Sequence, residues 1–296
     1  MEADLVLRAV VLPAAATLVL LLLLARHRPA VGVAETVSRW IPLSAALPAV
    51  LSYAQQEGAA GFAWPPSVAF GWSWLALVLA ALSAIVLRPV PAVLGAAACA
   101  FVSMSVVVPP GHSDPVVRVA AAALVAASAF AASFPPSGPA RGGVAEHAAW
   151  WLVFAVASVM ALLSGFAKLS FLIASLSAAA SFLALASARM PRLRTDGASN
   201  AAPACALGVL CFLGLGYDET GFPWWTWALL ACAPAGLAVG AWSWGSSRAR
   251  ALAVVAVPAL LALVALVLAL GWTGALDRFG EPSSPERDLY GLRAEP

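Results

Sequence analysis

The stretch ALAVVAVPALLALVALVLALGW, residues 251–272, decides the class of protein to which this chain belongs. Its 22 residues carry no charged side chain, and about 20 apolar residues are enough for a helix to cross the hydrocarbon core of a bilayer. Backbone N–H and C=O groups that are surrounded by lipid must pair within their own segment. This stretch is therefore predicted to be a membrane-spanning helix.

The rest of the chain repeats this pattern, with short breaks that are rich in proline, glycine and charge. The ten apolar runs lie at approximately 5–25, 32–54, 66–87, 89–108, 116–134, 147–165, 169–188, 201–216, 224–244 and 251–272. They lack the period-two alternation of membrane strands. The sequence therefore predicts an all-α, polytopic transmembrane bundle of about ten spans.

The overall composition excludes several classes of protein. Of the 296 residues, 62% are hydrophobic and 10% are charged, and the mean hydropathy is +0.92. An ordinary soluble domain has about 25% charged residues. A soluble globule, a disordered chain and a nucleic-acid binder are thus excluded, and the predicted partner is the lipid bilayer. The four cysteines lie in apolar runs without CxxC spacing, so we expect them to pack as small apolar side chains and predict no metal or cofactor.

The distribution of basic residues predicts the orientation, because Lys and Arg favour cytoplasmic loops. With the N-terminus outside, Lys168 is the only basic residue in a short outer loop. The arginines of the cytoplasmic loops are then Arg26, Arg28, Arg88, Arg141, Arg189, Arg192, Arg194, Arg248 and Arg250. Both termini are therefore predicted to be extracytoplasmic, with one membrane domain at 1–272 and a polar, disordered tail at 273–296. The first run is expected to be retained rather than cleaved, because its positive charges follow the apolar core.

The most suggestive polar side chains fall on the predicted outer face. They are Glu57, His112, Asp114, Tyr217, Asp218 and Glu219. Histidine and carboxylates can bind a metal or transfer protons. Each residue comes from a short loop, however, so a solvated loop edge is the alternative interpretation.

The second run is the weakest of the ten. It carries Glu35 and Arg39, spaced four residues apart on one helix face, where they can pair, and it also carries two prolines. It fits a full span or an interfacial helix followed by a short span. The pair is interpreted as a neutralised pair near the cytoplasmic end, with a gate or an ion site as the alternative.

Tryptophans gather near the ends of the runs, as expected of side chains that prefer the headgroup level. Those of the predicted belt are Trp40, Trp64, Trp150, Trp151, Trp224, Trp225, Trp227, Trp242, Trp244 and Trp272. Trp72 and Trp74 lie deeper, where they would pack or line a substrate path. The alanine-rich stretches 119–133 and 175–188 predict tightly packed interior helices, because small side chains allow close approach in lipid.

An internal repeat is also suggested by the sequence. The tetrapeptide GFAW at 61–64 is echoed by GFPW at 221–224, at an offset of 160 residues. Transporters are often built from repeats, and here 1–108 and 165–272 would be parallel copies. Recurrence of an outer loop followed by a belt tryptophan explains the same pattern without a duplication.

Three stretches of the chain resemble a known group of proteins. EGAAGFAWPPSVAFGWSWLAL at 57–77, ALLSGFAKLSFLIASLSAAA at 161–180 and GLGYDETGFPWWTWALLACAPAGL at 214–237 resemble an uncharacterised family of roughly ten-span membrane proteins of planctomycete-type bacteria. The resemblance implies a location in the bacterial inner membrane. It implies no activity and no functional residues.

Three functions remain open from the sequence. The first is a non-enzymatic membrane component or scaffold, with a membrane protein or a second copy of the chain as its partner. The second is a carrier of a small neutral or amphipathic solute. The third is a lipid-linked transferase at the outer face, with Glu57 or Asp218 and Glu219 as acid or base. Nucleotide-binding, HExxH and GxSxG motifs are missing from the sequence, which favours a protein without enzymatic activity.

Overall fold

A computed structural model describes residues 4, 6–26, 40–62, 64–66, 68–86, 92–107, 115–133, 143–190, 193, 197–242 and 246–274. About 90% of the structure is helical, and no strand occurs among the described residues. The prediction of an all-α fold is confirmed. Glu35, Arg39, His112 and Asp114 lie outside the described residues, as does the predicted tail beyond Gly274.

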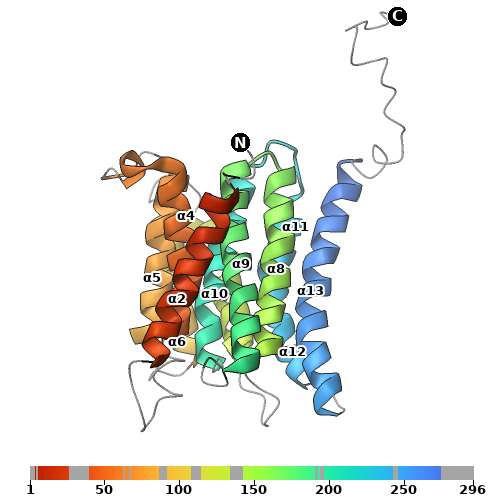
Figure 1. Ribbon diagram of the computed structural model, residues 1–296. Helices are drawn as coiled ribbons and strands as arrows, with labels where there is room; N and C mark the ends of the chain where they lie inside the picture. The colour runs from red at the N-terminus through yellow and green to blue at the C-terminus, as the bar shows by residue number, and fades with distance from the viewer. Residues whose placement is uncertain are drawn as a thin grey trace, which may run out of the picture.

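The helices follow one another along the chain with short connections (Figure 1). In order they are η1 (Leu7–Val11), α2 (Leu12–Arg26), η2 (Ile41–Ala45), α4 (Leu47–Glu57), η3 (Ala59–Phe62), η4 (Ala69–Trp72), α5 (Ser73–Val86), α6 (Ala92–Val107), α7 (Pro115–Ser133), α8 (Val144–Leu163), α9 (Ala167–Arg189), η6 (Gly197–Asn200), α10 (Ala201–Gly216), α11 (Trp224–Cys232), η7 (Ala233–Ala235), α12 (Gly236–Trp242) and α13 (Ser247–Trp272).

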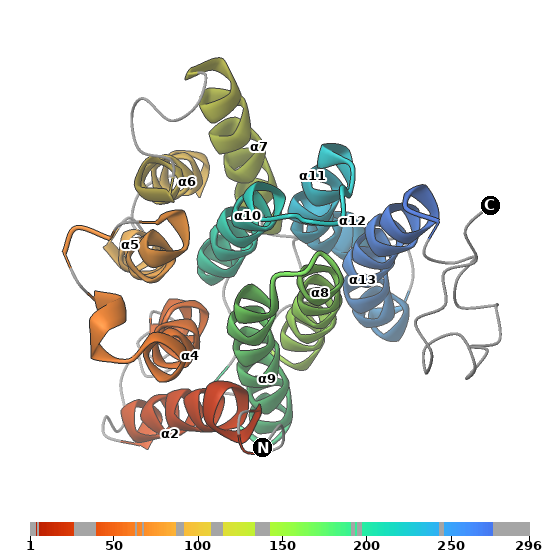
Figure 2. The same ribbon diagram turned by 90° about the horizontal axis from the view of Figure 1, so that it is seen from above.

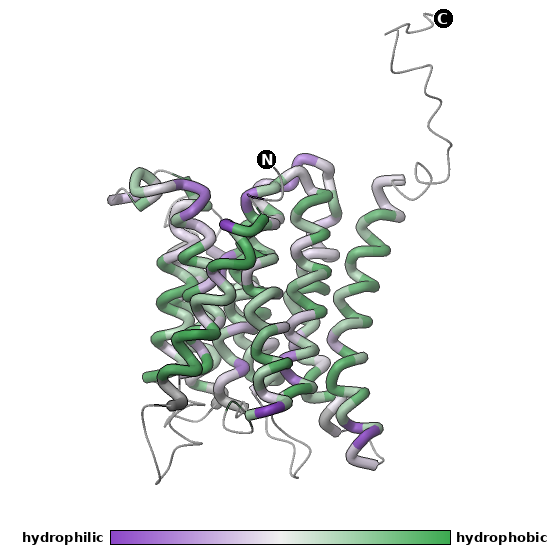
Figure 3. The backbone as a smooth tube through the Cα atoms, in the orientation of Figure 1, coloured by the Kyte–Doolittle hydropathy of each residue, from purple (hydrophilic) through white to green (hydrophobic). Residues whose placement is uncertain are grey.

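Neighbouring helices run in opposite directions, so their connections alternate between two ends of the bundle (Figure 1). We call the end that carries the connections 164–166 and 217–223 the upper end. The end at which α9 finishes and α10 begins is the lower end. Hydrophilic residues concentrate at these two ends, and hydrophobic residues cover the bodies of the helices between them (Figure 3). This distribution is compatible with a bilayer around the middle of the bundle.

Within the described part of the chain, five helical segments are long and apolar enough to cross a membrane. They are residues 69–86, α7, α8, α9 and α13. Shorter apolar helices lie at Leu7–Leu23, Leu94–Ser105, Ala201–Gly216 and Trp224–Gly240. The weak second run is represented by η2 and α4, which cover only its later part. The predicted repeat of 1–108 and 165–272 stays a prediction.

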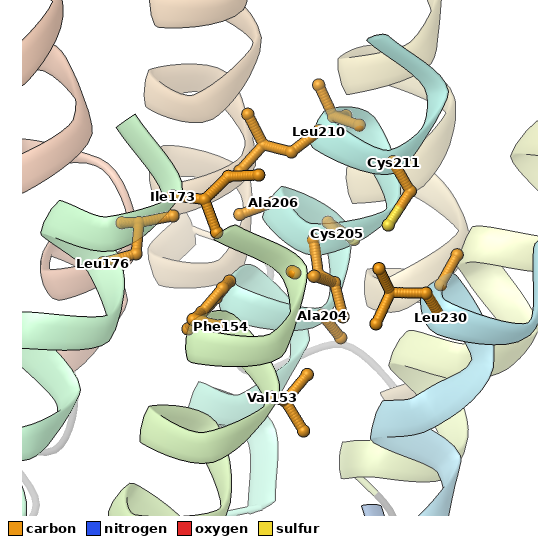
Figure 4. Close-up of a cluster of buried hydrophobic side chains, with 14 of the residues drawn as sticks. Val153, Phe154, Ile173, Leu176, Ala204, Cys205, Ala206, Leu210, Cys211 and Leu230 are labelled. Carbon is orange, nitrogen blue, oxygen red and sulfur yellow. The ribbon is translucent and has the colours of Figure 1, made fainter. Parts of the chain in front are cut away.

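Helix α10 lies at the centre of the bundle when the molecule is viewed along its axis (Figure 2). It contacts α5, α6, α7, α8, α9 and α11, and it is buried on all of its faces over most of its length. Its Cys205 and Leu210 pack with Phe154 of α8 and Ile173 of α9 (Figure 4). Cys99, Cys205 and Cys211 are buried and form no disulfide; the Cys99 thiol donates to the Ala80 carbonyl (3.1 Å). Buried thiols of this kind pack as small, largely apolar side chains.

Serines join α8 to α9 through hydrogen bonds that run in both directions. The Ser158 hydroxyl donates to the Ser170 carbonyl (3.0 Å), and the Ser170 hydroxyl donates to the Ser158 carbonyl (2.9 Å). Further down, the Ser177 hydroxyl donates to the Trp151 carbonyl (3.0 Å). Such bonds are well suited to lipid, because an unpaired hydroxyl there is costly. They fix the register of this helical hairpin.

The two alanine-rich stretches differ in how much of each is buried inside the protein. In α9, 61% of the span is buried inside the protein, which confirms an interior helix, whereas in α7 the share is only 28%. The prediction that α7 is an interior helix is therefore wrong. Small side chains allow a close approach, but they do not determine how many neighbours a helix has. Helix α7 lies at the periphery of the bundle (Figure 2).

Helix α12 meets α13 through Gly236 and Gly240, which form a GxxxG pattern. A Cβ atom at Gly236 would strike the backbone of Pro258, and one at Gly240 would strike the backbone of Ala253. Glycine at these positions lets two helix backbones come closer than any other residue would allow. Because the obstacle is backbone, a side-chain rotation cannot relieve the contact.

We predict that Gly240→Ala lowers the unfolding free energy by about 1–3 kcal/mol, the usual cost of overpacking. The matched control is Gly216→Ala on α10, because a Cβ there meets nothing within 4 Å. Unfolding of detergent-solubilised protein in SDS, followed by circular dichroism, measures both variants. Equal midpoints for the two would contradict the close contact between α12 and α13.

Candidate functional site

Four of the six predicted outer-face residues lie together at the upper end. Glu57 is the last residue of α4, and Tyr217, Asp218 and Glu219 belong to the connection between α10 and α11. Tyr217 and Glu219 contact Phe166 and Ser164 of the α8–α9 connection, whereas Glu57 contacts Lys168 in the first turn of α9.

Glu57 is held in an ion pair with Lys168. The Lys168 ammonium donates to Glu57 Oε1 at 2.6 Å, although the two residues are 111 positions apart. The lysine is exposed and the carboxylate is partly exposed, so the pair contributes at most about 1 kcal/mol to stability. Its main effect is to join the end of α4 to the start of α9.

Both oxygens of the Asp218 carboxylate accept hydrogen bonds from its own loop and from the start of α11. Its Oδ1 accepts hydrogen bonds from the Thr220 N–H (2.9 Å), the Thr220 hydroxyl (2.8 Å) and the Gly221 N–H (3.2 Å). Its Oδ2 accepts from the Phe222 N–H (2.9 Å) and from the Trp227 indole (3.2 Å). Gly221 has a φ of +77°, which favours glycine. A carboxylate with this many donors stabilises the loop and the start of α11.

Tyr217 and Glu219 fasten the same loop to other parts of the upper end. The Tyr217 hydroxyl accepts from the Phe70 N–H (3.2 Å), and its ring packs on Phe166 with a centroid distance of 4.6 Å. The Glu219 N–H donates to the Ser164 carbonyl (3.1 Å). The Glu219 carboxylate is exposed and lies beside the α8–α9 connection.

Trp72 and Trp74 pack against aromatic neighbours at the upper end. The centroid of the Trp72 ring lies 5.4 Å from that of the Trp64 ring. The centroid of the Trp74 ring lies 5.3 Å from that of the Phe62 ring. Both pairs are edge-to-face, a favourable geometry for aromatic rings. Neither tryptophan lines the two cavities described below.

A buried polar cluster at the lower end is not anticipated from the sequence. Asn200 is almost fully buried, accepts from the Trp150 indole (2.9 Å) and donates to Glu146 Oε2 (3.2 Å). Next to it, His147 Nε2 forms a hydrogen bond with the Leu193 carbonyl (3.2 Å). The cluster ties the first turn of α8 to the residues that precede α10.

The sequence hides this cluster because its members sit at the edges of apolar runs. Glu146 and His147 lie where the run 147–165 begins, and Asn200 lies just before 201–216. Polar residues in such positions normally face water. The sequence gives one indication of the cluster, because the starts of these two apolar runs are predicted to lie at the same end of the bundle.

Two of the predicted belt tryptophans are buried instead. Trp150 and Trp227 are shielded from the surface, and each donates its indole N–H to a buried or half-buried side chain. The belt prediction is wrong for these two. Trp64, Trp224, Trp242 and Trp272 are exposed near helix ends, as the belt requires.

The described residues of the bundle form a small cavity and a larger groove, among other hollows. The small cavity of about 20 Å³ near the lower polar cluster is lined by Ser44, His147 and Asn200 among others, and its size suits a single water molecule, which needs about 10–15 Å³. The larger, of about 570 Å³, is an apolar groove between α6, α7, α10 and α11 in the upper half. The described residues contain no group of three His, Cys, Asp or Glu side chains that could hold a metal ion.

We predict that Asp218→Asn destabilises the protein by about 1–3 kcal/mol, because an amide NH₂ in place of Oδ2 cannot accept from the partly buried Phe222 N–H and Trp227 indole. Glu219→Gln is the control from the neighbouring position and should leave stability unchanged. Thermal unfolding in mild detergent distinguishes the two variants. If Asp218→Asn unfolds at the wild-type temperature, the carboxylate does not hold the loop.

The lower cluster predicts coupling between Trp150 and Asn200. Asn200→Leu and Trp150→Phe should each cost about 1–3 kcal/mol, because each leaves a buried polar partner unpaired. The double variant should cost less than the sum of the two by about 0.5–3 kcal/mol. SDS unfolding followed by circular dichroism measures the cycle, and strict additivity would show that the two side chains do not interact.

Comparison with known proteins adds no assignment to these observations. No protein-family model, curated protein or solved structure matches this chain.

Proposed function

We propose that this chain is a non-enzymatic component of the bacterial inner membrane that supports a larger membrane assembly. The observation that carries the proposal is the use of the polar side chains at the upper end. Glu57 pairs with Lys168, and Asp218 is saturated by its own loop. The carboxylates of Glu57 and Asp218, which are the best placed for chemistry at this end, thus hold segments of the protein together.

The topology within this proposal is ten crossings with both termini outside. Support comes from the alternating direction of consecutive helices and from the positions of the basic residues. Arg26, Arg189, Arg248 and Arg250 lie at the lower end, whereas Lys168 lies at the upper end together with Arg8 and Arg118, which are within helices. Basic residues favour the cytoplasmic side, so the lower end is assigned to the cytoplasm.

A transferase is less well supported by this geometry. A general acid or base needs a carboxylate that is free to exchange a proton with a substrate. The Asp218 oxygens accept from five donors, and Glu57 is neutralised by Lys168. Glu219 alone among the described outer-end acids is exposed without such a role, and a single carboxylate does not make an acid–base pair.

A carrier of an amphipathic solute is the second candidate, and the apolar groove favours it. The groove occupies only the upper half of the bundle, however. Below it, the Ser128 hydroxyl donates to the Ala231 carbonyl (2.9 Å), and Ala204, Leu207 and Leu230 are fully buried. These described residues pack closely below the groove, so a component that does not transport fits this part of the interior better.

Helix α7 is the face that we assign to a partner helix. It is peripheral (Figure 2), and its exposed alanines include Ala123 and Ala127, spaced four residues apart. Small residues with this spacing allow another membrane helix to approach closely. The exposed face of α13 instead carries bulky residues such as Leu260 and Leu263, which suit lipid.

We predict that the protein isolated from native membranes in lipid particles carries a membrane-protein partner, or a second copy, at constant stoichiometry. The double substitution Ala123→Leu with Ala127→Leu should remove this partner, because the larger side chains hold a docking helix away. Quantitative mass spectrometry of the tagged, purified particles measures the partner.

The matched control is Ala256→Leu, the same change at an exposed alanine of α13, which should retain the partner. Glu57→Gln combined with Glu219→Gln should retain it too, because no chemistry is involved. A monomer without a partner would contradict the proposal. Loss of the partner in the glutamine variant would show that these carboxylates take part in the function, which would contradict the proposal.

A further inference from the structure

We propose that α12 and residues 247–257 of α13 form a unit that is hinged on Pro234 and Pro258 and is held in place by Ser128 of α7. We call this unit the lower hairpin. The inference goes beyond the proposed function, since it concerns a motion within the chain and not the partner of the chain.

A short 3₁₀ segment interrupts one membrane helix in the middle of its length. An apolar helical stretch runs from Trp224 to Gly240, but η7 divides it into α11 and α12 and contains Pro234. Proline has no N–H, and its ring clashes with the carbonyl of the preceding turn. The Ala233 N–H accordingly donates to the Leu230 carbonyl, three residues back rather than four. A 3₁₀ stretch in the middle of a helix often marks a hinge.

Ser128 supplies the hydrogen bond that is missing at this break. Where the bonds span three residues, the Ala231 carbonyl would accept from the N–H of residue 234, which is a proline. The buried Ser128 hydroxyl donates to this carbonyl at 2.9 Å. Ser133 of the same helix instead donates to a carbonyl of its own α7. Because an unpaired carbonyl in lipid is costly, Ser128 holds the break in its present geometry.

Helix α13 is weakened at the same level. Pro258 lies inside this helix and cannot donate to the Val254 carbonyl one turn before it. A Cβ atom on Gly236 would lie 2.8 Å from the Pro258 nitrogen, and Gly236 is only two residues from Pro234. The two interruptions of helical hydrogen bonding therefore lie side by side, as the two pivots of a hinge must.

Below the two prolines, α12 and α13 pack as one unit. A Cβ atom on Gly240 would strike the backbone of Ala253 and Val254, so the two helices meet there without side chains between them. Backbones in such close contact hold each other firmly. Bending is then concentrated at the prolines, which are the usual places for a helix to kink.

The bundle covers the upper part of α13 far more than the part in the lower hairpin. The buried residues of α13 above Pro258 are Ala262, Ala265, Leu266 and Ala269, whereas Val254 is the one below it. Val254 lies against Gly240 of α12, within the lower hairpin itself. Helix α13 is also at the edge of the bundle (Figure 2). The lower hairpin can therefore move without opening the core around α10.

Hydrogen–deuterium exchange of the full-length protein in lipid nanodiscs tests the role of Ser128. Ser128→Ala should speed exchange of the amides of residues 233–237 about fivefold to thirtyfold, as expected when one buried hydrogen bond is lost. Ser133→Ala is the matched control, because its hydroxyl donates within α7, and it should leave these amides unchanged. Equal exchange in the wild type and in Ser128→Ala would overturn the proposal.

The Pro234→Ala variant distinguishes a hinge from a general loss of stability. Alanine restores an N–H at residue 234 and lets the helix continue through the break. The same amides should exchange about fivefold more slowly than in the wild type. Ser128→Ala added to this variant should then change exchange by less than about twofold, because residue 234 supplies the donor itself. An equal effect of Ser128→Ala in both backgrounds would contradict the hinge.

Distances between pairs of spin labels measure the motion. Labels at Leu252→Cys and Leu185→Cys report on the lower hairpin relative to α9. Labels at Leu268→Cys and Leu162→Cys report on the upper half of α13 relative to α8. All four positions are exposed, and Cys232→Ala removes the native thiol that is half-buried rather than buried.

The lower pair of labels should give a distance distribution at least about twice as wide as that of the upper pair, because bending is concentrated at the prolines. Ser128→Ala should widen the lower distribution further. Pro234→Ala combined with Pro258→Ala should narrow it to the width of the upper pair. Equal widths for the two pairs in the wild type, or a lower width that the proline variant leaves unchanged, would show a fixed bend and overturn the proposal.

Discussion

Close packing of small side chains around α10 is the constraint on which the rest of this structure depends. In lipid, helices gain little by hiding apolar surface, so van der Waals contact must hold them together. Gly214 of α10 makes room for the ring of Trp227, and Gly240 of α12 makes room for the backbone of α13. Wherever such positions occur the helices meet, and the polar side chains between them are mostly serines that bond to backbone carbonyls.

The polar side chains at the helix ends complete the assembly, because each joins segments that are remote in the sequence. The Lys168–Glu57 pair links α9 to α4, and Asn200 links its own connection to α8 through Trp150. A buried polar group without a partner is costly, so these bonds fix one arrangement of the loops. The same commitment removes most of them from consideration as catalytic groups.

The positions of most helices could be predicted from the sequence, but which helices pack against one another could not. The run 201–216 coincides with α10, because an unbroken apolar run in lipid must pair its backbone groups within the segment. The Lys168–Glu57 pair could not be foreseen, since neither side chain reveals which of many loops lies beside it. Trp227 was expected at the membrane surface and is buried, because the Asp218 carboxylate accepts its indole N–H. The many alanines of α7 likewise predicted that this helix can pack closely against others. They did not predict on how many of its sides it does so.

Helix α7 connects the packing of the bundle with its relation to the membrane. It carries the side chains of an interior helix, yet only 28% of its span is buried, so its alanines face space that this chain does not fill. Carbon atoms that face an unfilled space lose dispersion contacts. The hydrocarbon of a bilayer can occupy such a space. On its exposed side the same alanines leave room for another helix. An alanine-rich helix at the edge of a tightly packed bundle thus suits the partner helix that we propose for it.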